Sequence, residues 1–240
     1  MAYTILALDT SAGPASCAVV REGEILASAV TNTPLTHSQT ILPMVQDMLK
    51  NSGLAFADVN LLAVSAGPGS FTGVRIGVAA VKGLAAPRNL PCAAVSTLEA
   101  IAENAQGLPF DGVVCAVMDA RCRQVYTACF ASEGGRLSRL TPDEAISIEE
   151  LQNRLLSYKK SVFLVGDGAK LCYTVLNGQF PGLRIAPPAL RYQQAAGVAA
   201  VAARLAAADK LCAAASLLPA YLRLPQAERE LRQRQAAQGN

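Results

Sequence analysis

The chain has 240 residues, of which 52% are hydrophobic and 5% aromatic, and its formal net charge is +3. The length allows one or two domains with a sizeable core. The single histidine, His37, excludes a metal site that needs two histidines of this chain, and the small charge does not indicate a basic nucleic-acid-binding surface.

Cysteine usage and hydropathy indicate the compartment. The seven cysteines form no C-x-x-C pair and lie in apolar runs, as buried thiols of a reducing compartment do. No uninterrupted apolar stretch reaches the roughly 18 residues of a membrane span, and no basic region opens the chain. We therefore expect a cytoplasmic protein without a signal peptide or membrane contact.

The first half of the chain predicts an α/β unit. Its predicted elements are strands at 3–8, 15–20 and 25–30, a helix at 38–51, a strand at 61–65, a helix at 72–86, a strand at 92–95 and a helix from 97. Turns with Asp, Gly and Pro at 9–14, 21–24 and 67–69 separate these elements.

The second half repeats this order. Strands are predicted at 113–118, 124–131, 136–140 and 161–165, and the capping box Ser147/Glu150 opens a helix that ends near 157. A glycine turn at 166–168 and a further helix follow, and 190–215 is helical and rich in alanine. The repetition predicts an internal duplication that gives two similar α/β lobes facing a cleft, although such an order also arises by chance.

Two turns carry residues suited to phosphate binding. Asp9 and Ser11 follow the first strand, where a hydroxyl, turn amides and a carboxylate with Mg²⁺ could hold a phosphate; an ordinary Asx turn is the alternative. Gly67 and Gly69 allow close backbone approach, and Ser70 or Thr72 can cap the next helix. The segment lacks the Gly-Lys-Ser/Thr ending of a Walker loop.

Two helices carry stripes that suit either the core or a partner. In the helix at 38–51, Ile41, Met44, Val45 and Met48 form an apolar stripe. In the helix at 72–86, Gly73, Gly77, Ala80 and Leu84 share a face on which small residues would let another helix approach closely. Pattern alone does not distinguish packing within the chain from docking of a partner.

Several segments together resemble one family across nearly the whole chain. They are ILALDTS at 5–11, HSQTILPMV from 37, AGPGSFTGVRIG at 66–77, VSTLEAIA at 95–102, MDARCRQVY at 118–126, GDGA at 166–169 and PAYLRLPQAE at 219–228. The resemblance is to TsaB (YeaZ), the bacterial subunit of tRNA threonylcarbamoyladenosine biosynthesis. It implies the actin/Hsp70/sugar-kinase-like (ASKHA) fold, with two ribonuclease-H-like lobes at 1–104 and 105–215 and a C-terminal segment at 216–240 that packs back on the first lobe.

The resemblance implies a partner of an enzyme. TsaB pairs with its catalytic paralogue TsaD, which modifies the adenosine beside the anticodon of ANN-decoding tRNAs; TsaE, an ATPase, binds the pair, and TsaC supplies the adenylate. TsaD holds its metal with two histidines four residues apart, and here these positions are His37 and Ile41. We therefore expect no catalytic residue, no metal site and no required cofactor, with tRNA bound mainly through the complex and a homodimer when TsaD is absent.

The resemblance places two sets of site residues. A remnant nucleotide or phosphate site, with ATP or ADP at the boundary with TsaD, would comprise Asp9, Ser11, Gly67, Gly69, Ser70, Thr72, Asp119, Gly166 and Gly168. The partner interface would comprise Ile41, Met44, Val45, Met48, Gly73, Arg75, Gly77, Ala80, Val81 and Leu84.

An ATP-binding phosphotransferase or remnant ATPase is the alternative, because Asp9, Asp119 and the turn at 166–168 supply carboxylates and glycines in the cleft. Asp119 is followed by Ala-Arg rather than glycine, which weakens the reading of this turn as a phosphate loop. A metal-dependent peptidase fails on the histidine count.

Overall fold

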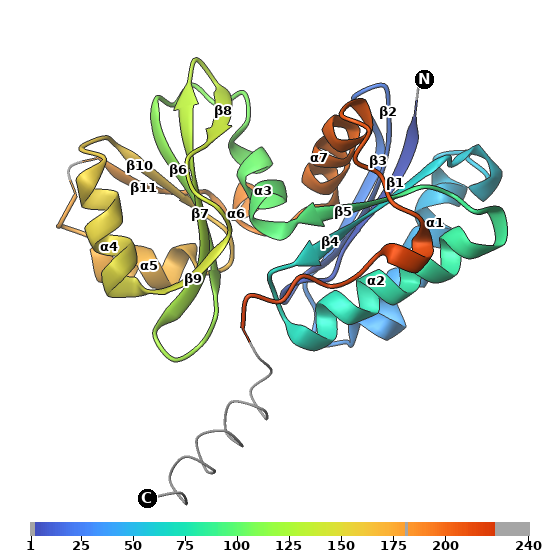
Figure 1. Ribbon diagram of the computed structural model, residues 1–240, viewed down its shortest axis with the longest axis horizontal. Helices are drawn as coiled ribbons and strands as arrows, with labels where there is room; N and C mark the ends of the chain where they lie inside the picture. Colours follow the sequence, from blue (N-terminus) through green and yellow to red (C-terminus); the bar gives the residue numbers. More distant parts are fainter. Residues whose placement is uncertain (1–2, 181, 224–240) are drawn as a thin grey trace, which may run out of the picture.

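Two β-sheets flanked by helices form two lobes that lie side by side (Figure 1). The computed structural model describes residues 3–180 and 182–223. The strands of the first sheet are β1 (Thr4–Asp9), β2 (Ala15–Arg21), β3 (Glu24–Thr31), β4 (Leu61–Gly67) and β5 (Cys92–Ser96). Those of the second are β6 (Gly112–Asp119), β7 (Gln124–Glu133), β8 (Arg136–Arg139), β9 (Glu144–Ser147), β10 (Val162–Val165) and β11 (Leu183–Ile185).

The two sheets share one topology. The first has the order β3-β2-β1-β4-β5, and the second has β8-β7-β6-β10-β11, with β9 paired to β7 beside this path. In each, the first three strands are antiparallel and the last two lie parallel to the first strand. The order of elements therefore matches the predicted duplication, and β9 and β11 are strands that the sequence did not indicate.

The helices cover both faces of the first sheet because the residues of β1 alternate. Leu6 and Leu8 point into a core shared with α1 (His37–Asn51) and α2 (Phe71–Ala85), and Ile5 and Ala7 point into a core shared with α7 (Ala195–Ala207). The second sheet packs its core against α4 (Ile148–Ser157) and α5 (Ala169–Leu176). Two shorter helices are α3 (Thr97–Ala102) and α6 (Pro188–Arg191).

Two helices cross between the lobes. α3 follows the last strand of the first sheet but packs against β6 and β7 of the second, and α7 follows the second sheet but packs against β1 and β2. The predicted second lobe, 105–215, includes α7. Its small, buried Ala195, Val198, Ala199 and Ala202 instead fit the first sheet closely. The boundaries 1–104, 105–215 and 216–240 themselves remain predictions.

The segment after α7 returns over the first lobe towards the gap between the lobes (Figure 1). The backbone of Cys212 forms an isolated antiparallel β-bridge with that of Cys92 in β5, and Leu217 is fully buried in the core beneath α2. We call residues 212–223 the strap. The rest of the predicted C-terminal segment, 224–240, lies outside the described residues.

Candidate functional site: the cavity between the lobes

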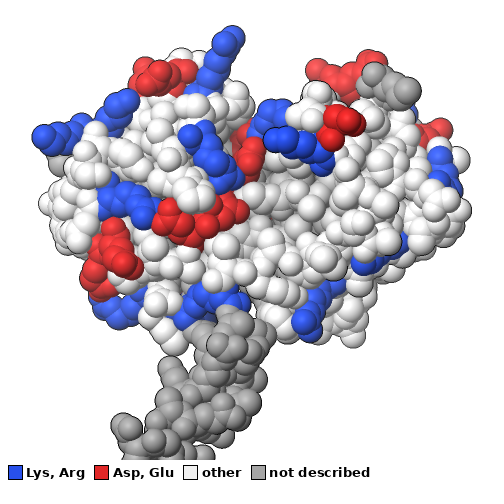
Figure 2. Space-filling view, in the orientation of Figure 1, with Lys and Arg blue, Asp and Glu red and all other residues white. Residues whose placement is uncertain are grey.

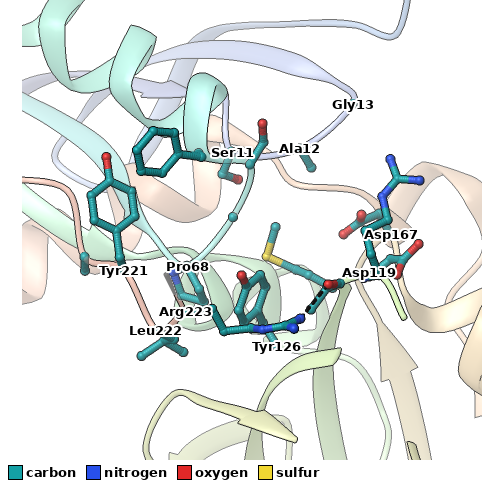
Figure 3. Close-up of a pocket in the computed structure, with 17 residues that line it drawn as sticks. Ser11, Ala12, Gly13, Pro68, Asp119, Tyr126, Asp167, Tyr221, Leu222 and Arg223 are labelled. Carbon is teal, nitrogen blue, oxygen red and sulfur yellow. Dashed lines mark hydrogen bonds between the residues drawn. The ribbon is translucent and has the colours of Figure 1, made fainter. Parts of the chain in front are cut away.

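A cavity of about 480 Å³ lies between the lobes, where strand ends from both sheets meet the strap (Figure 3). The first lobe contributes residues around Ser11 and Gly69, the second contributes Asp119 and Asp167, and the strap contributes Ala220 to Arg223. Such a position at the carboxyl ends of strands is where α/β proteins commonly bind ligands.

Asp9 ends β1 but is fully buried beneath the cavity wall. Its Oδ1 accepts hydrogen bonds from the Ser11 amide (2.9 Å) and hydroxyl (2.7 Å), and its Oδ2 accepts one from the Ser65 hydroxyl. Burial raises the pKa of the Asp9 carboxyl above its usual value, and the bonds from Ser65 and Ser11 oppose that rise. The carboxylate is committed to holding this turn against β4.

The glycine-rich segment packs against the same turn. A Cβ at Gly69 would lie 2.5 Å from the Ser11 carbonyl oxygen, and one at Gly73 would lie 2.1 Å from that of Thr10. The Ser70 amide donates to Ser11 O (2.7 Å), and the Ser70 hydroxyl caps α2 by accepting from the Gly73 amide. These glycines are thus explained by close approach within the chain, which a motif in the sequence cannot distinguish from close approach of a phosphate.

His37 and Ile41, the two positions at which the resemblance expects a metal-binding pair to be missing, both have structural roles in the first lobe. His37 begins α1, and its Nε2 lies 2.7 Å from the carbonyl oxygen of Ala12, so the imidazole joins the helix to the β1–β2 turn. Ile41, one helical turn later, is 1% exposed and packs in the core of the first sheet. Neither side chain is presented to the cavity.

The second-lobe wall carries two carboxylates side by side (Figure 3). Asp119 is exposed at the end of β6, and its Oδ1 accepts the Arg121 amide at 2.7 Å. Asp167 follows β10, and its Oδ1 accepts a 2.7 Å hydrogen bond from the buried Gln193. Burial raises the pKa of Asp167 to about 6; the neighbouring Asp119 charge adds to the rise, and the Gln193 bond opposes it.

The residues predicted for a nucleotide remnant separate into two groups. Ser11, Gly69, Ser70 and Asp119 line the cavity. The other five lie outside its lining. Asp9 is buried and Thr72 is exposed on α2. The three glycines approach the chain's own backbone: Gly67 at the Ala220 carbonyl oxygen, Gly166 at that of Val117, and Gly168 at Met118 and Asp119.

Six of the ten residues predicted for the partner interface are buried in the core of this chain, and the interface itself stays a prediction. Buried in the first lobe are Ile41, Val45, Met48, Gly73, Gly77 and Val81. Met44, Ala80 and Leu84 are half-buried beside them, and Arg75 is exposed. Helical periodicity identifies the buried face correctly, but does not say that the chain's own sheet covers it.

Sequence reasoning missed several residues of the cavity. Tyr221 and Arg223 belong to the predicted C-terminal segment 216–240, which the resemblance places on the first lobe but not at the cavity, and they lie more than 100 residues away from Asp119 in the sequence. Asp167 lay within the quoted Gly-Asp-Gly turn but was passed over for its glycines, and a buried Gln193 left no pattern at all. Only the turn at Asp167 carried a signal that could have identified it.

Known proteins resemble the chain over most of its length. The family model described as TsaD, tRNA N6-adenosine threonylcarbamoyltransferase, matches residues 24–231. The tRNA threonylcarbamoyladenosine biosynthesis protein TsaB of Escherichia coli (strain K12) is 34% identical over 220 residues, which cover 91% of this chain and 94% of that protein. The TsaB protein of Bacillus subtilis (strain 168) is 36% identical over 168 residues, covering 70% and 72%.

Solved structures show the same likeness. YeaZ from Pseudomonas aeruginosa superposes with a TM-score of 0.78 at 32% identity and covers 92% of this chain and 100% of that one. Component A of the (R)-2-hydroxyglutaryl-CoA dehydratase of Acidaminococcus fermentans has a TM-score of 0.51 at 15% identity, covering 85% and 99%. The second likeness concerns the fold alone. Together they confirm the predicted actin/Hsp70/sugar-kinase-like fold.

Proposed function

Since this chain belongs to the TsaB (YeaZ) family of tRNA threonylcarbamoyladenosine biosynthesis proteins, we propose that it is a non-catalytic subunit of that pathway. It binds and stabilises the catalytic paralogue TsaD, supports docking of TsaE, and forms a homodimer when TsaD is absent. TsaD then modifies the adenosine beside the anticodon of ANN-decoding tRNAs with the adenylate that TsaC makes. The proposal places the chain in the cytoplasm, with any ATP or ADP at the boundary with TsaD.

The observation that carries this proposal is the pair His37 and Ile41. A pair of metal-binding histidines requires two imidazoles that both face the metal. Here the one imidazole is bonded to the Ala12 carbonyl, and the position four residues later is a buried isoleucine in the core. The cavity polar groups of the first lobe are likewise held within the chain, which supports a role for this lobe in assembly rather than in chemistry.

The outward face of α2 suits a helix of a partner. Its exposed positions include Thr72, Ala79 and Gly83, and half-buried Ala80 lies beside them. Small side chains let a second helix approach closely, because the distance between packed helices depends on the residues at the contact. Figure 2 shows that most of the front of the first lobe is uncharged, with a few basic side chains towards its lower edge, and α2 itself carries the exposed Arg75. We propose that this face, rather than the buried stripes, contacts TsaD.

A matched pair of substitutions tests this surface. Ala79 on α2 and Ala203 on α7 are both exposed alanines within helices of the first lobe, on opposite faces of its sheet. Ala79→Arg should weaken binding to TsaD at least tenfold, since an interface core tolerates neither the bulk nor an unpaired charge. Ala203→Arg should bind as the native chain does. Equal binding by both variants would place the interface elsewhere.

Reconstitution tests the non-catalytic role. tRNA modification by TsaC, TsaD and TsaE should require this chain, and should survive Asp119→Asn and His37→Gln with activity within about threefold of native, because neither group would touch reacting atoms. Asp9→Ala is a poor test here, since that carboxyl is fully buried with three hydrogen bonds. Loss of activity by Asp119→Asn, with TsaD binding intact, would contradict the proposal.

A phosphotransferase or remnant ATPase remains the second candidate, favoured by the two carboxylates on the cavity wall. Asp119 and Asp167 lie side by side there, as metal-phosphate chemistry requires acidic groups at its site. Titration calorimetry of the isolated chain with Mg-ATP separates the two functions. Binding of Mg-ATP with micromolar affinity that Asp119→Asn abolishes would support the ATP-binding enzyme. A titration without any heat of binding would exclude this candidate.

A further inference from the structure

The strap is anchored firmly in its first part. Cys212 and Cys92 exchange two backbone hydrogen bonds of 2.8 Å, and Leu217 is completely buried in the core of the first lobe. Lys82 of α2 donates from its Nζ to the carbonyl oxygens of Ala215 (3.1 Å) and Leu217 (3.3 Å). Up to Leu217 the strap is therefore an integral part of the first lobe.

The strap changes character directly after Leu217. The exposed fraction rises from 0% at Leu217 to 67% at Leu218, and Tyr221 and Leu222 are 41% and 39% exposed. The Ala220 amide donates to Ala66 O (2.7 Å), and its carbonyl fits the space that Gly67 leaves open. The Tyr221 ring lies 4.8 Å from that of Phe71, and its hydroxyl accepts a 2.7 Å bond from Arg75 Nε. The Tyr221 contacts lie at the surface, where water can replace them, whereas the Ala220 contacts reach the buried Ala66 and Gly67.

The end of the strap reaches the other lobe. Arg223 donates from Nη1 to the carbonyl oxygen of Ala120 at 2.8 Å, next to Asp119 (Figure 3). Within the described part of the chain, this is the only hydrogen bond between the strap and the second lobe.

The other polar links between the lobes lie away from the cavity. Around α3, Arg139 pairs with Glu99 at 3.0 Å and Ser96 donates to Asp143 at 2.6 Å. The lobes are thus joined around α3 by an ion pair and a hydrogen bond, and at the cavity by the strap, which forms part of its wall. This arrangement would allow the lobes to rotate about the α3 contacts when the strap contact is broken.

We propose that Pro219–Arg223 is a releasable latch that fastens the two lobes and forms one wall of the cavity. When Arg223 leaves Ala120 and Tyr221 leaves Phe71, the latch swings about Leu218 while the anchored part stays in place. The lobes then open about the α3 side, and the cavity widens. The proposal goes beyond the partner role and does not depend on it.

Spin labels on opposite sides of the cavity measure this opening in the full chain. Cys122 is exposed on the β6–β7 turn, and Thr72→Cys places a second label on α2. Cys212→Ser removes the half-buried thiol, and the other five cysteines are buried. Double electron–electron resonance should give one narrow distribution of the distance between the two spin labels when the strap is native. Arg223→Ala removes the latch contact with the second lobe, and Tyr221→Ala removes a contact with the first lobe. Both variants should add a component with longer and more broadly distributed distances between the labels.

Hydrogen exchange and two controls complete the test. Arg223→Ala should speed exchange of the Ala220 amide about tenfold, the effect of losing one hydrogen bond to a charged group. Arg223→Lys, which can still donate to Ala120, should restore the narrow distribution, and Arg136→Ala on β8 should leave both measurements unchanged. A native distance distribution in Arg223→Ala and Tyr221→Ala would overturn the latch, whether or not exchange at Ala220 becomes faster.

Discussion

Asp167 offers a sharp test of the cavity's electrostatics. Its carboxyl lies between Gln193, which donates to it, and the like charge of Asp119, and burial is the main cause of its raised pKa of about 6. Asp167→Asn keeps the shape and an acceptor for Gln193 while removing the titration. The substitution should therefore change how stability depends on pH, apart from any constant effect of the new amide.

Proton linkage sets the sign and size of the Asp167 contribution to the free energy of unfolding. The unfolded carboxyl has the ordinary value of 3.8, so between pH 4 and 6 the folded protein binds more protons at this group than the unfolded chain does. This contribution to stability is fully present below pH 3.8 and is lost as pH rises through 6. A shift of about two units corresponds to about 3 kcal/mol. Relative to the native chain, Asp167→Asn should gain up to that amount between pH 4 and 7.

Urea unfolding at several pH values measures this gain. The chain has no tryptophan, so far-UV circular dichroism is the suitable signal. Asp47→Asn, at an exposed position on α1, is the control and should give a difference in unfolding free energy with much weaker pH dependence. A difference between Asp167→Asn and native that stays constant from pH 4 to 7 would refute a raised pKa at Asp167. Carboxyl carbon NMR of the native chain would then show a midpoint near 4.

Two further predictions concern packing and thiols. Gly73→Ala should destabilise the fold by about 2 kcal/mol or more, because the added Cβ meets the Thr10 carbonyl at 2.1 Å, whereas Gly83→Ala in the same helix meets nothing within 4 Å and should stabilise by up to about 1 kcal/mol. Thermal melting measures both effects: Gly73→Ala should lower Tm and Gly83→Ala should raise it. Tm shifts of the same sign in the two variants would contradict the packing explanation. Iodoacetamide should modify one thiol rapidly in the native chain, exposed Cys122, because burial raises the pKa of Cys17 and Cys172 to about 12. A Cys122→Ser variant that still reacts rapidly would show that a second thiol is accessible.

Local patterns predicted the elements of the fold well, because they are properties of neighbouring residues. The capping box is present as predicted: the Glu150 amide donates to Ser147 Oγ at 3.1 Å, and the Ser147 amide donates to Glu150 Oε2 at 2.9 Å. The predicted helix at 38–51 and strand at 61–65 end within two residues of α1 and β4. The same patterns did not predict the crossing of α7, since an apolar helix face fits either sheet.

The site was harder to predict because its residues meet only in three dimensions. The glycines at 67, 69 and 73 gave the strongest signal in the chain, and each makes room for a carbonyl of the chain itself. A glycine reports that something approaches its backbone, but the approaching atom can belong to the protein or to a ligand. Tyr221 and Arg223, by contrast, lie in the quoted segment PAYLRLPQAE, but nothing in the sequence showed that they form a wall of the cavity.

The use of polar groups distinguishes the two sides of the cavity. A catalytic site keeps preorganised donors and acceptors open towards its substrate. On the first-lobe side, the hydroxyl and amide of Ser11 and those of Ser70 all have partners within the chain. On the second-lobe side, Asp119 and Asp167 each use one oxygen within the chain, but both line the cavity and Asp119 is exposed there. A residual ligand of this cavity would therefore be recognised mainly by the second lobe and the strap, so Asp119→Asn and Arg223→Ala are the variants that would reveal it.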